Sequence, residues 1–289
     1  RNELHRIYGT DYENMTLRQL ESIGAEMLVP DRKARICIKP NLVVPSPAET
    51  GATTHPEVVE GIIRYLQEEG FSDMVILESS WVGDRTDLAF AYCGYTDLAE
   101  KYGIALWDLQ KDESVLTDCA GLALHVCRQA LMVDFLINVP VLKGHCQTGI
   151  SCALKNMKGL IPNKEKRRFH TMGLHRPIAC LNSYIKQDFI VIDHICGDLS
   201  FEEGGNPVVR SCIMAALDPV LTDAYACSLL HYQLKDIPYI SMAEKAGVGC
   251  SDLTRLKLIT CEGDAHEDLP AQNLLDICYA VDAIDSCSA

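Results

Sequence analysis

The stretch RICIKPNLVV at residues 35–44, followed by THPEVVEGIIRYLQEEG at 54–70 and MVIL at 74–77, decides the fold. The first and last pieces are short apolar runs of the kind that form buried strands. The middle piece has apolar residues at helical spacing behind a Thr-x-x-Glu pattern, Thr54 to Glu57, which predicts a capping box with a proline in the first turn. A strand, a helix and a strand in this order predict two parallel strands joined by a crossover helix.

The same alternation continues along the chain. We expect strands at 104–107, 134–139, 189–192, 208–217 and 256–260, and helices at 87–102 with a bend near Gly94, 177–186, 219–232 and 238–246. This order predicts an α/β fold, a mostly parallel sheet with helices on both faces. The length of 289 residues fits one α/β domain over 1–289, or two α/β lobes at about 1–135 and 136–289 with a cleft between them.

The composition is that of a soluble globular protein, with 48% hydrophobic and 23% charged residues. The chain has no apolar run long enough to span a bilayer and no signal-peptide core at its start, so we expect no membrane contact. Fourteen cysteines without a Cys-x-x-Cys pair predict free thiols in the reducing cytoplasm. A net charge of −14 argues against nucleic-acid binding.

One segment departs from this acidic background. Residues 138–176 contain eight lysines and arginines and a single acidic residue, Glu165. Cations gathered in this way create a local field for an anion. The segment follows the strand expected at 134–139, and ligands of parallel sheets bind beyond the carboxyl ends of the strands. We therefore expect the functional centre here, with an anionic small molecule as the partner.

Within the segment, glycines alternate with Lys143, His145 and Lys155. Glycine lets the backbone approach a ligand closely, and lysine supplies a point charge for phosphate or carboxylate. The phosphate-binding Gly-x-x-x-x-Gly-Lys-Ser/Thr pattern is absent. The remaining cations of the segment are equally compatible with a solvated loop: Lys164, Lys166, Arg167 and Arg168.

Histidines provide the candidate reactive groups, because a neutral imidazole binds transition metals and also carries protons near pH 7. Neighbouring lysines should depress their pKa values and keep the rings neutral. The candidate catalytic residues are His145, Lys155 and His170, and the candidate ligands of a transition metal, nickel or iron, are His170, His175 and Cys146.

Polar residues after the other strands should line the same sheet edge. The free amides of the helix expected to start at Thr54 would form an anion site. The candidate cofactor-binding residues are Lys39, Asn41, Thr53, Thr54, Lys143, Asn156 and Lys158, and the loop Glu78-Ser79-Ser80 should lie beside them. Four acidic residues follow the strand expected at 189–192. A carboxylate among them would orient a histidine or bind a cation, or the four belong to a solvated loop: Asp193, Asp198, Glu202 and Glu203.

Several of these motifs resemble the domain of unknown function 362 family over residues 35–256. They are KPNLV at 39–43, TTHP at 53–56, GY at 94–95, NVPVLKGH at 138–145, KNMKG at 155–159, His170, Asp193 and DPVLTD at 218–223. The resemblance implies an association with iron–sulfur proteins, some of which carry an appended ferredoxin module. Here such a cluster would be completed by residues beyond 289.

The order of His145, Lys155 and His170 is similar to the nickel-pincer lactate racemase superfamily. That resemblance implies that Lys155 tethers a pyridine-derived nucleotide, that His170 or His175 binds nickel, and that His145 carries a proton. Residues 78–85 contain no histidine, which is a departure from the pattern of that superfamily.

Three classes of function follow. The first is an enzyme with acid–base or redox chemistry that depends on a metal or cofactor. The second is an iron–sulfur electron carrier or cofactor-assembly protein that uses Cys146, Cys152 and Cys287 and has a redox partner protein. The third is a basic docking surface for an acidic partner. A homo-oligomer is compatible with each.

Overall fold

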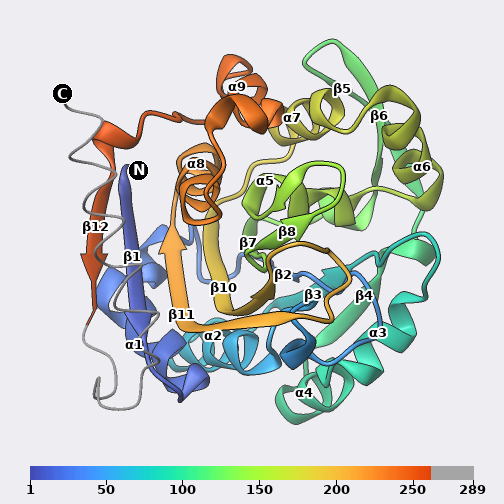
Figure 1. The fold of residues 1–289 in the computed structure, drawn as a ribbon. Coiled ribbons are helices and arrows are strands. Elements are labelled where there is room, and N and C mark those ends of the chain that lie inside the picture. Colours follow the sequence, from blue (N-terminus) through green and yellow to red (C-terminus); the bar gives the residue numbers. More distant parts are fainter. Residues whose placement is uncertain (262–289) are drawn as a thin grey trace.

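A single eight-stranded sheet runs through the computed structural model, which describes residues 1–261 (Figure 1). Its strand order is β12-β1-β11-β10-β7-β2-β3-β4. The strands are β1 (Glu3–Tyr8), β2 (Ile36–Pro40), β3 (Met74–Glu78), β4 (Ala105–Asp108), β7 (Phe135–Val139), β10 (Phe189–Asp198), β11 (Pro207–Ala216) and β12 (Lys257–Thr260). Only β11 runs antiparallel to its neighbours in this sheet. The predicted mostly parallel α/β fold is therefore confirmed.

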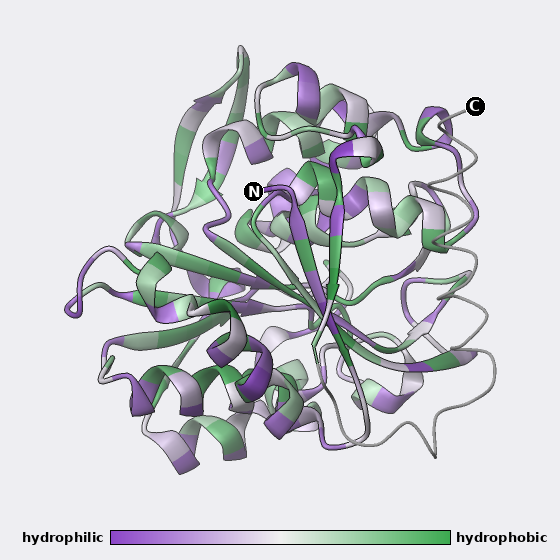
Figure 2. Ribbon diagram, turned by 90° about the vertical axis from the view of Figure 1, so that its left-hand side faces the viewer, coloured by the Kyte–Doolittle hydropathy of each residue, from purple (hydrophilic) through white to green (hydrophobic). Residues whose placement is uncertain are grey.

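Helices cover both faces of the sheet (Figure 1). One face carries α1 (Tyr12–Ile23), α2 (Pro56–Glu68), α3 (Thr86–Tyr92) and α4 (Tyr95–Tyr102), and the other carries α5 (Ala153–Asn156), α6 (Asn163–Met172), α7 (His175–Tyr184), α8 (Pro219–Leu229) and α9 (Pro238–Lys245). Every residue of β2, β3, β7 and β10 is buried, as expected for strands covered on both sides. Figure 2 shows the hydrophobic strands at the centre and hydrophilic residues on the outer turns of the helices.

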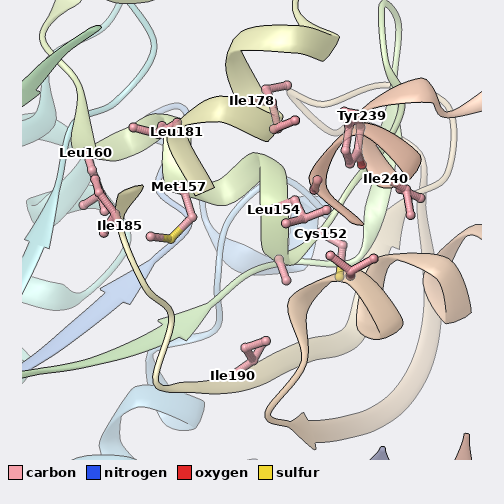
Figure 3. Packing of buried hydrophobic residues seen from close by; sticks show 14 of the residues in the cluster. Cys152, Leu154, Met157, Leu160, Ile178, Leu181, Ile185, Ile190, Tyr239 and Ile240 are labelled. Atoms are coloured by element: carbon pink, nitrogen blue, oxygen red, sulfur yellow. The ribbon is translucent and has the colours of Figure 1, made fainter. Parts of the chain in front are cut away.

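Alternation along the strands divides the apolar side chains between two cores. Ile36 and Ile38 of β2 belong to the core beneath α1 and α2, whereas Cys37 between them belongs to the core on the opposite face. Figure 3 shows part of this second core, in which Leu154 and Met157 lie among side chains of α7. The short turn that contains Lys155 is thereby anchored to the sheet.

Small elements complete the described part of the chain. They are the hairpin β5 (Ser114–Cys119) and β6 (Leu122–Cys127), the hairpin β8 (Lys143–His145) and β9 (Gly149–Ser151), and the 3-10 turns η1 (Ala25–Leu28), η2 (Ala48–Thr50), η3 (Leu109–Lys111), η4 (Gln129–Leu131), η5 (Met157–Leu160), η6 (Leu234–Asp236) and η7 (Leu253–Arg255). Neither hairpin was expected from the sequence. None of the helices in residues 1–261 is long and apolar enough to cross a membrane, and the twelve cysteines of this range are free thiols.

The start of α8 agrees with the prediction from the sequence, and the start of α2 differs from it. Asp218 caps α8 as expected, because its carboxylate accepts hydrogen bonds from the amides of Val220 and Leu221. The predicted capping box is wrong: α2 begins at Pro56, and its N-cap, His55, makes no side-chain cap. The Thr54 hydroxyl is drawn away from the helix because it donates to the carbonyl of Val139 on β7.

Candidate functional site

A cavity of about 100 Å³ lies at the carboxyl edge of the sheet, between the loops that follow β2, β3 and β7 and the loop that joins β10 to β11. This volume accommodates several water molecules or a small ligand. Its lining residues are Asn41, Val43, Glu78, Ser79, Ser80, Trp81, Val82, His145, Lys155, Asn156, Lys158, Gly159, Lys166, His170, Glu202 and Glu203. The basic segment therefore contributes to one cavity together with polar residues from three other loops.

The turn of α5 brings Lys155 to this cavity. The buried carboxylate of Asp223 on α8 accepts hydrogen bonds from the amides of Ala153, at 2.7 Å, and Leu154, at 3.2 Å, so it fixes the start of the turn. Asn182 of α7 donates to the carbonyl of Leu154. With Leu154 held in the core, the side chain of Lys155 extends to the cavity instead.

The ammonium group of Lys155 is the distinctive feature of the site. Its side chain makes no hydrogen bond or ion pair with any residue between 1 and 261. Burial, followed by the positive charges of Lys158 and Lys143, holds the pKa of Lys155 well below its ordinary value. A desolvated cation beside like charges is unfavourable, and a bound anion would relieve both penalties.

Lys39, by contrast, is fully engaged by the protein. It is completely buried, and its Nζ lies 2.9 Å from Oε2 of Glu78 and 2.9 Å from the carbonyl of Pro40. Gly159 packs directly on this pair, because a methyl group there would come within 2.0 Å of Glu78 Oε1. Lys39 therefore supports the cavity from beneath and is not among the residues that line it, so its contact with a cofactor stays a prediction.

Two further lysines are also tied to protein oxygens. Nζ of Lys143 donates to Oδ1 of Asn41 at 2.9 Å and to the carbonyl of Glu202 at 2.7 Å, and burial lowers its pKa to about 7. Nζ of Lys166 donates to Oγ of Ser79 at 2.6 Å. Lys143 thus holds the loop after β10 in place and is not among the residues that line the cavity, so its contact with a cofactor stays a prediction.

Lys158 and His170 form a second pair at the cavity. Nζ of Lys158 lies 2.9 Å from Nε2 of His170. Burial lowers the pKa of Lys158 to about 8, and burial together with the charges of Lys158 and Lys155 lowers the pKa of His170. His170 is therefore neutral near pH 7, and its Nε2 accepts the hydrogen bond from the ammonium group.

His145 has a defined tautomer. Its Nδ1 accepts hydrogen bonds from the amides of Gln147, at 3.0 Å, and Thr148, at 3.2 Å, so the proton of the neutral ring resides on Nε2. Nε2 lies 3.3 Å from Oε1 of Glu202. Burial, with the charges of Lys155 and Lys158, lowers the pKa of His145 to about 2. The imidazole is therefore a neutral donor that faces an ionised carboxylate.

One group in residues 1–261 has the composition of a metal site. The ligand atoms of His145, Cys146 and Glu202 lie within 4.8 Å of one another. The hydrogen bonding fits a metal poorly, because Nε2 of His145 carries its proton and the Cys146 thiol donates to Glu202 at 3.2 Å. Burial and Glu202 raise the pKa of Cys146, which disfavours the thiolate that metals bind.

The predicted metal ligands are not gathered together. Nε2 of His170 is occupied by Lys158, and the ring of His175 stacks on Tyr239, with 5.9 Å between ring centroids, and does not line the cavity. The predicted pairing of His170 and His175 around a metal is therefore not supported by this arrangement. Cys152 is buried at the start of α5, and Cys287 lies outside the described residues.

The hydroxyl groups of Thr53 and Thr54, for which the sequence predicted an anion site, are engaged within the protein. Both hydroxyls are buried and donate to backbone carbonyls, that of Thr53 to Ser46. The amide of His55 donates to Oδ2 of Asp193 at 2.7 Å, so a carboxylate of the chain already occupies the place expected for the ligand. Although burial opposes a charge on His55, Asp193 raises its pKa to about 11.

The structure thus brings together six of the predicted residues: Asn41, His145, Lys155, Asn156, Lys158 and His170. It also places the Glu78-Ser79-Ser80 loop and Glu202 where the sequence analysis expected them. Trp81 and Val82 form an apolar part of the lining that was not predicted from the sequence. The signal in the sequence was a tryptophan in an otherwise polar loop directly after a buried strand, which indicates a side chain at the site.

Residues 36–228 match the family described as "Domain of unknown function (DUF362)", and the chain belongs to this family. A thylakoid-associated protein of Synechocystis is 27% identical over 230 residues, which cover 74% of this chain and 68% of that protein.

Two solved structures are similar at lower levels. The lactate racemase apoprotein of Thermoanaerobacterium thermosaccharolyticum is 19% identical with a TM-score of 0.43, over 65% of this chain and 49% of that one. A structural genomics target from Thermotoga maritima is 14% identical with a TM-score of 0.42, over 82% and 60%. The chain therefore spans about half of the first structure and three fifths of the second.

Proposed function

We propose that the chain binds a small molecule bearing a phosphate or carboxylate group in this cavity, with Lys155 and Lys158 as the cationic contacts. The observation that carries the proposal is the ammonium of Lys155, which lines the cavity without a protein partner in the described part of the chain. Lysines outnumber carboxylates around the cavity, and a bound anion would favour the charged forms of those lysines whose pKa values burial lowers: Lys39, Lys143, Lys155, Lys158 and Lys166 against Glu78, Glu202 and Glu203.

The proposal includes proton transfer to or from the ligand. Glu202 has a pKa below its ordinary value, through hydrogen bonds from Cys146 and the charge of Lys155 that outweigh its burial, and is therefore an ionised proton acceptor at neutral pH. The Nε2–H of His145, a neutral hydrogen-bond donor, lies 3.3 Å from Oε1 of this carboxylate. His170 remains neutral and accepts a hydrogen bond from the ammonium of Lys158, which, with a pKa lowered to about 8, is the acid of the site. An acid and a base around a bound oxyanion are suited to proton abstraction next to a carbonyl or carboxylate.

A metal cofactor is the second candidate, and the observation in its favour is the grouping of His145, Cys146 and Glu202. This alternative requires His145 to release the proton on Nε2 and Cys146 to become a thiolate. When bound, such a metal would supply Lewis-acid or redox chemistry. We give it the lower rank because the hydrogen bonds of the triad oppose it.

The test of the first proposal is calorimetric titration of the chain with inorganic phosphate. Lys155→Gln should abolish detectable binding, whereas Lys164→Gln, which removes an exposed charge from the same segment, should retain it. Because the ammonium of Lys155 has no partner in residues 1–261, Lys155→Gln should leave the thermal midpoint unchanged or raise it.

Equal affinity for phosphate in Lys155→Gln and Lys164→Gln would contradict the proposal, because the loss would then reflect net charge alone. A lowered thermal midpoint in Lys155→Gln would mean that the side chain supports the fold and not a ligand.

A further inference from the structure

The cavity has an apolar part that a bare oxyanion would not use. Trp81, Val82 and Val43 belong to the same lining as Lys155 and Lys158. The Trp81 side chain is large and 44% exposed, although it follows a fully buried strand. An exposed tryptophan beside a cationic pocket has an open aromatic face for a ligand.

The loop holds Trp81 in place. Its amide donates to the carbonyl of Val43 at 2.9 Å, and its carbonyl accepts from the amide of Asp84 at 3.0 Å and from the side chain of Gln110 at 3.4 Å. Both loops that form this side of the cavity are thereby connected at Trp81. The backbone position of the indole is fixed before any ligand arrives.

Gly83 fixes the ring itself. A methyl group at this position would come within 1.9 Å of Cζ3 of Trp81, so the indole lies directly on the glycine backbone. Gly83 is not among the glycines with positive φ, so its backbone conformation does not require glycine. The space left by the missing side chain is therefore the reason for glycine here, and the indole occupies that space.

We infer that the ligand is an aromatic oxyanion, a flat ring that carries a phosphate or carboxylate, with the ring against Trp81 and the charged group at Lys155 and Lys158. The inference rests on the proposed function and deepens it. A cavity of about 100 Å³ that is lined by both kinds of residue places them within reach of one small molecule. Trp81 is then the residue that determines specificity, because stacking discriminates a ring from a bare anion.

The experiment compares matched pairs of probes by calorimetry. Phenyl phosphate is compared with inorganic phosphate, and benzoate with acetate, so that the two pairs distinguish a phosphate from a carboxylate. We expect the aromatic member of at least one pair to bind roughly tenfold more tightly, as stacking on an indole provides. A Trp107→Phe variant, which leaves Trp81 as the one tryptophan of the chain, should show quenching of its fluorescence by that probe.

Three variants assign the preference to the indole. Trp81→Ala should remove the preference for the ring while phosphate affinity stays the same, and Trp81→Phe should retain most of it. Gly83→Ala should weaken the preference, because its methyl group displaces the indole. Tyr92→Ala removes an exposed aromatic side chain that does not line the cavity, and it should behave as the unaltered chain.

Equal binding of both members in each pair, with phosphate still bound, would overturn the inference and leave the proposed function standing. A preference for the ring that survives in Trp81→Ala would overturn it as well. If none of the four probes binds, the inference fails together with the proposed function.

Discussion

The loop after β2 and the segment after β7 carry similar polar residues and use them differently. At the end of β2 and in the loop that follows it, polar groups have partners within the protein: those of Lys39, Thr53 and Thr54 and the amide of His55. After β7, Lys155 reaches the same sheet edge and has no partner in the described residues. The first region is a polar scaffold, and the second has an unsatisfied cation.

This difference shows that a polar residue at the carboxyl end of a strand is not by itself evidence for a site. Lys155 differs from Lys39 in whether a protein group lies within hydrogen-bond distance of its ammonium. Lys39 has the carboxylate of Glu78 at 2.9 Å, whereas Lys155 makes no ion pair within residues 1–261, and repulsion by Lys158 and Lys143 affects its pKa more than attraction by Glu202 does. Substitutions on either side of this contrast test it.

Removal of the partner of Lys39 should have the largest effect. Glu78→Ala leaves a completely buried ammonium without its carboxylate, and loss of one member of a buried ion pair costs about 3–5 kcal/mol. Denaturant unfolding measures the loss. Glu113→Ala, which removes the exposed partner of Arg128, is the control and should change the unfolding free energy little. Similar values for the two variants would mean that Lys39 needs no scaffold partner.

Gly159→Ala should have the next largest effect. The added methyl group would approach Glu78 Oε1 to 2.0 Å and Lys39 Nζ to 2.6 Å, and overpacking of this kind costs about 1–3 kcal/mol. The unfolding free energy measures it. Combination with Glu78→Ala should reduce the cost, because the clashing carboxylate is gone. Full additivity of the two changes would contradict the close packing of Gly159 on this pair.

The affinity for an anion should fall as pH rises. The pKa of Lys158 is lowered to about 8, so its ammonium is present below that pH and is lost above it. Sulfate, whose own charge does not change in this range, should bind about tenfold more weakly at pH 9 than at pH 7. Lys158→Met should bind sulfate weakly at both values. A flat profile in the unaltered chain would show that Lys158 does not contribute a charge to the cavity.

The smallest effect is expected for metal. Because Nε2 of His145 carries its proton and the Cys146 thiol is neutral, zinc titrated at pH 7 should bind no more tightly than to a Cys146→Ala variant. Competition with a colorimetric zinc chelator measures this. A large loss of zinc affinity in Cys146→Ala would establish His145, Cys146 and Glu202 as a metal site and favour the metal cofactor over the anionic ligand.

The sequence predicted the sheet, most helices and the location of the cavity, because these depend on periodicity and on strands that end at a common edge. It did not predict which lysines have partners. Lys143 is tied to Asn41, and Lys39 to Glu78, across separations that no local pattern encodes. The error at Thr54 has the same cause, since Val139 on another strand competes for its hydroxyl. Local motifs report which groups are present, and tertiary contacts decide which remain available.

The two hydrogen bonds from the amides of Ala153 and Leu154 to Asp223 connect α8 to the turn that carries Lys155. α8 is buried from Pro219 to Cys227, so substitutions in the core around it can shift its position. Any shift of this helix is transmitted to the amides of Ala153 and Leu154 and from there to the reach of Lys155. A random mutagenesis screen for altered ligand retention should therefore recover substitutions at buried positions of α8, although no residue of this helix lines the cavity.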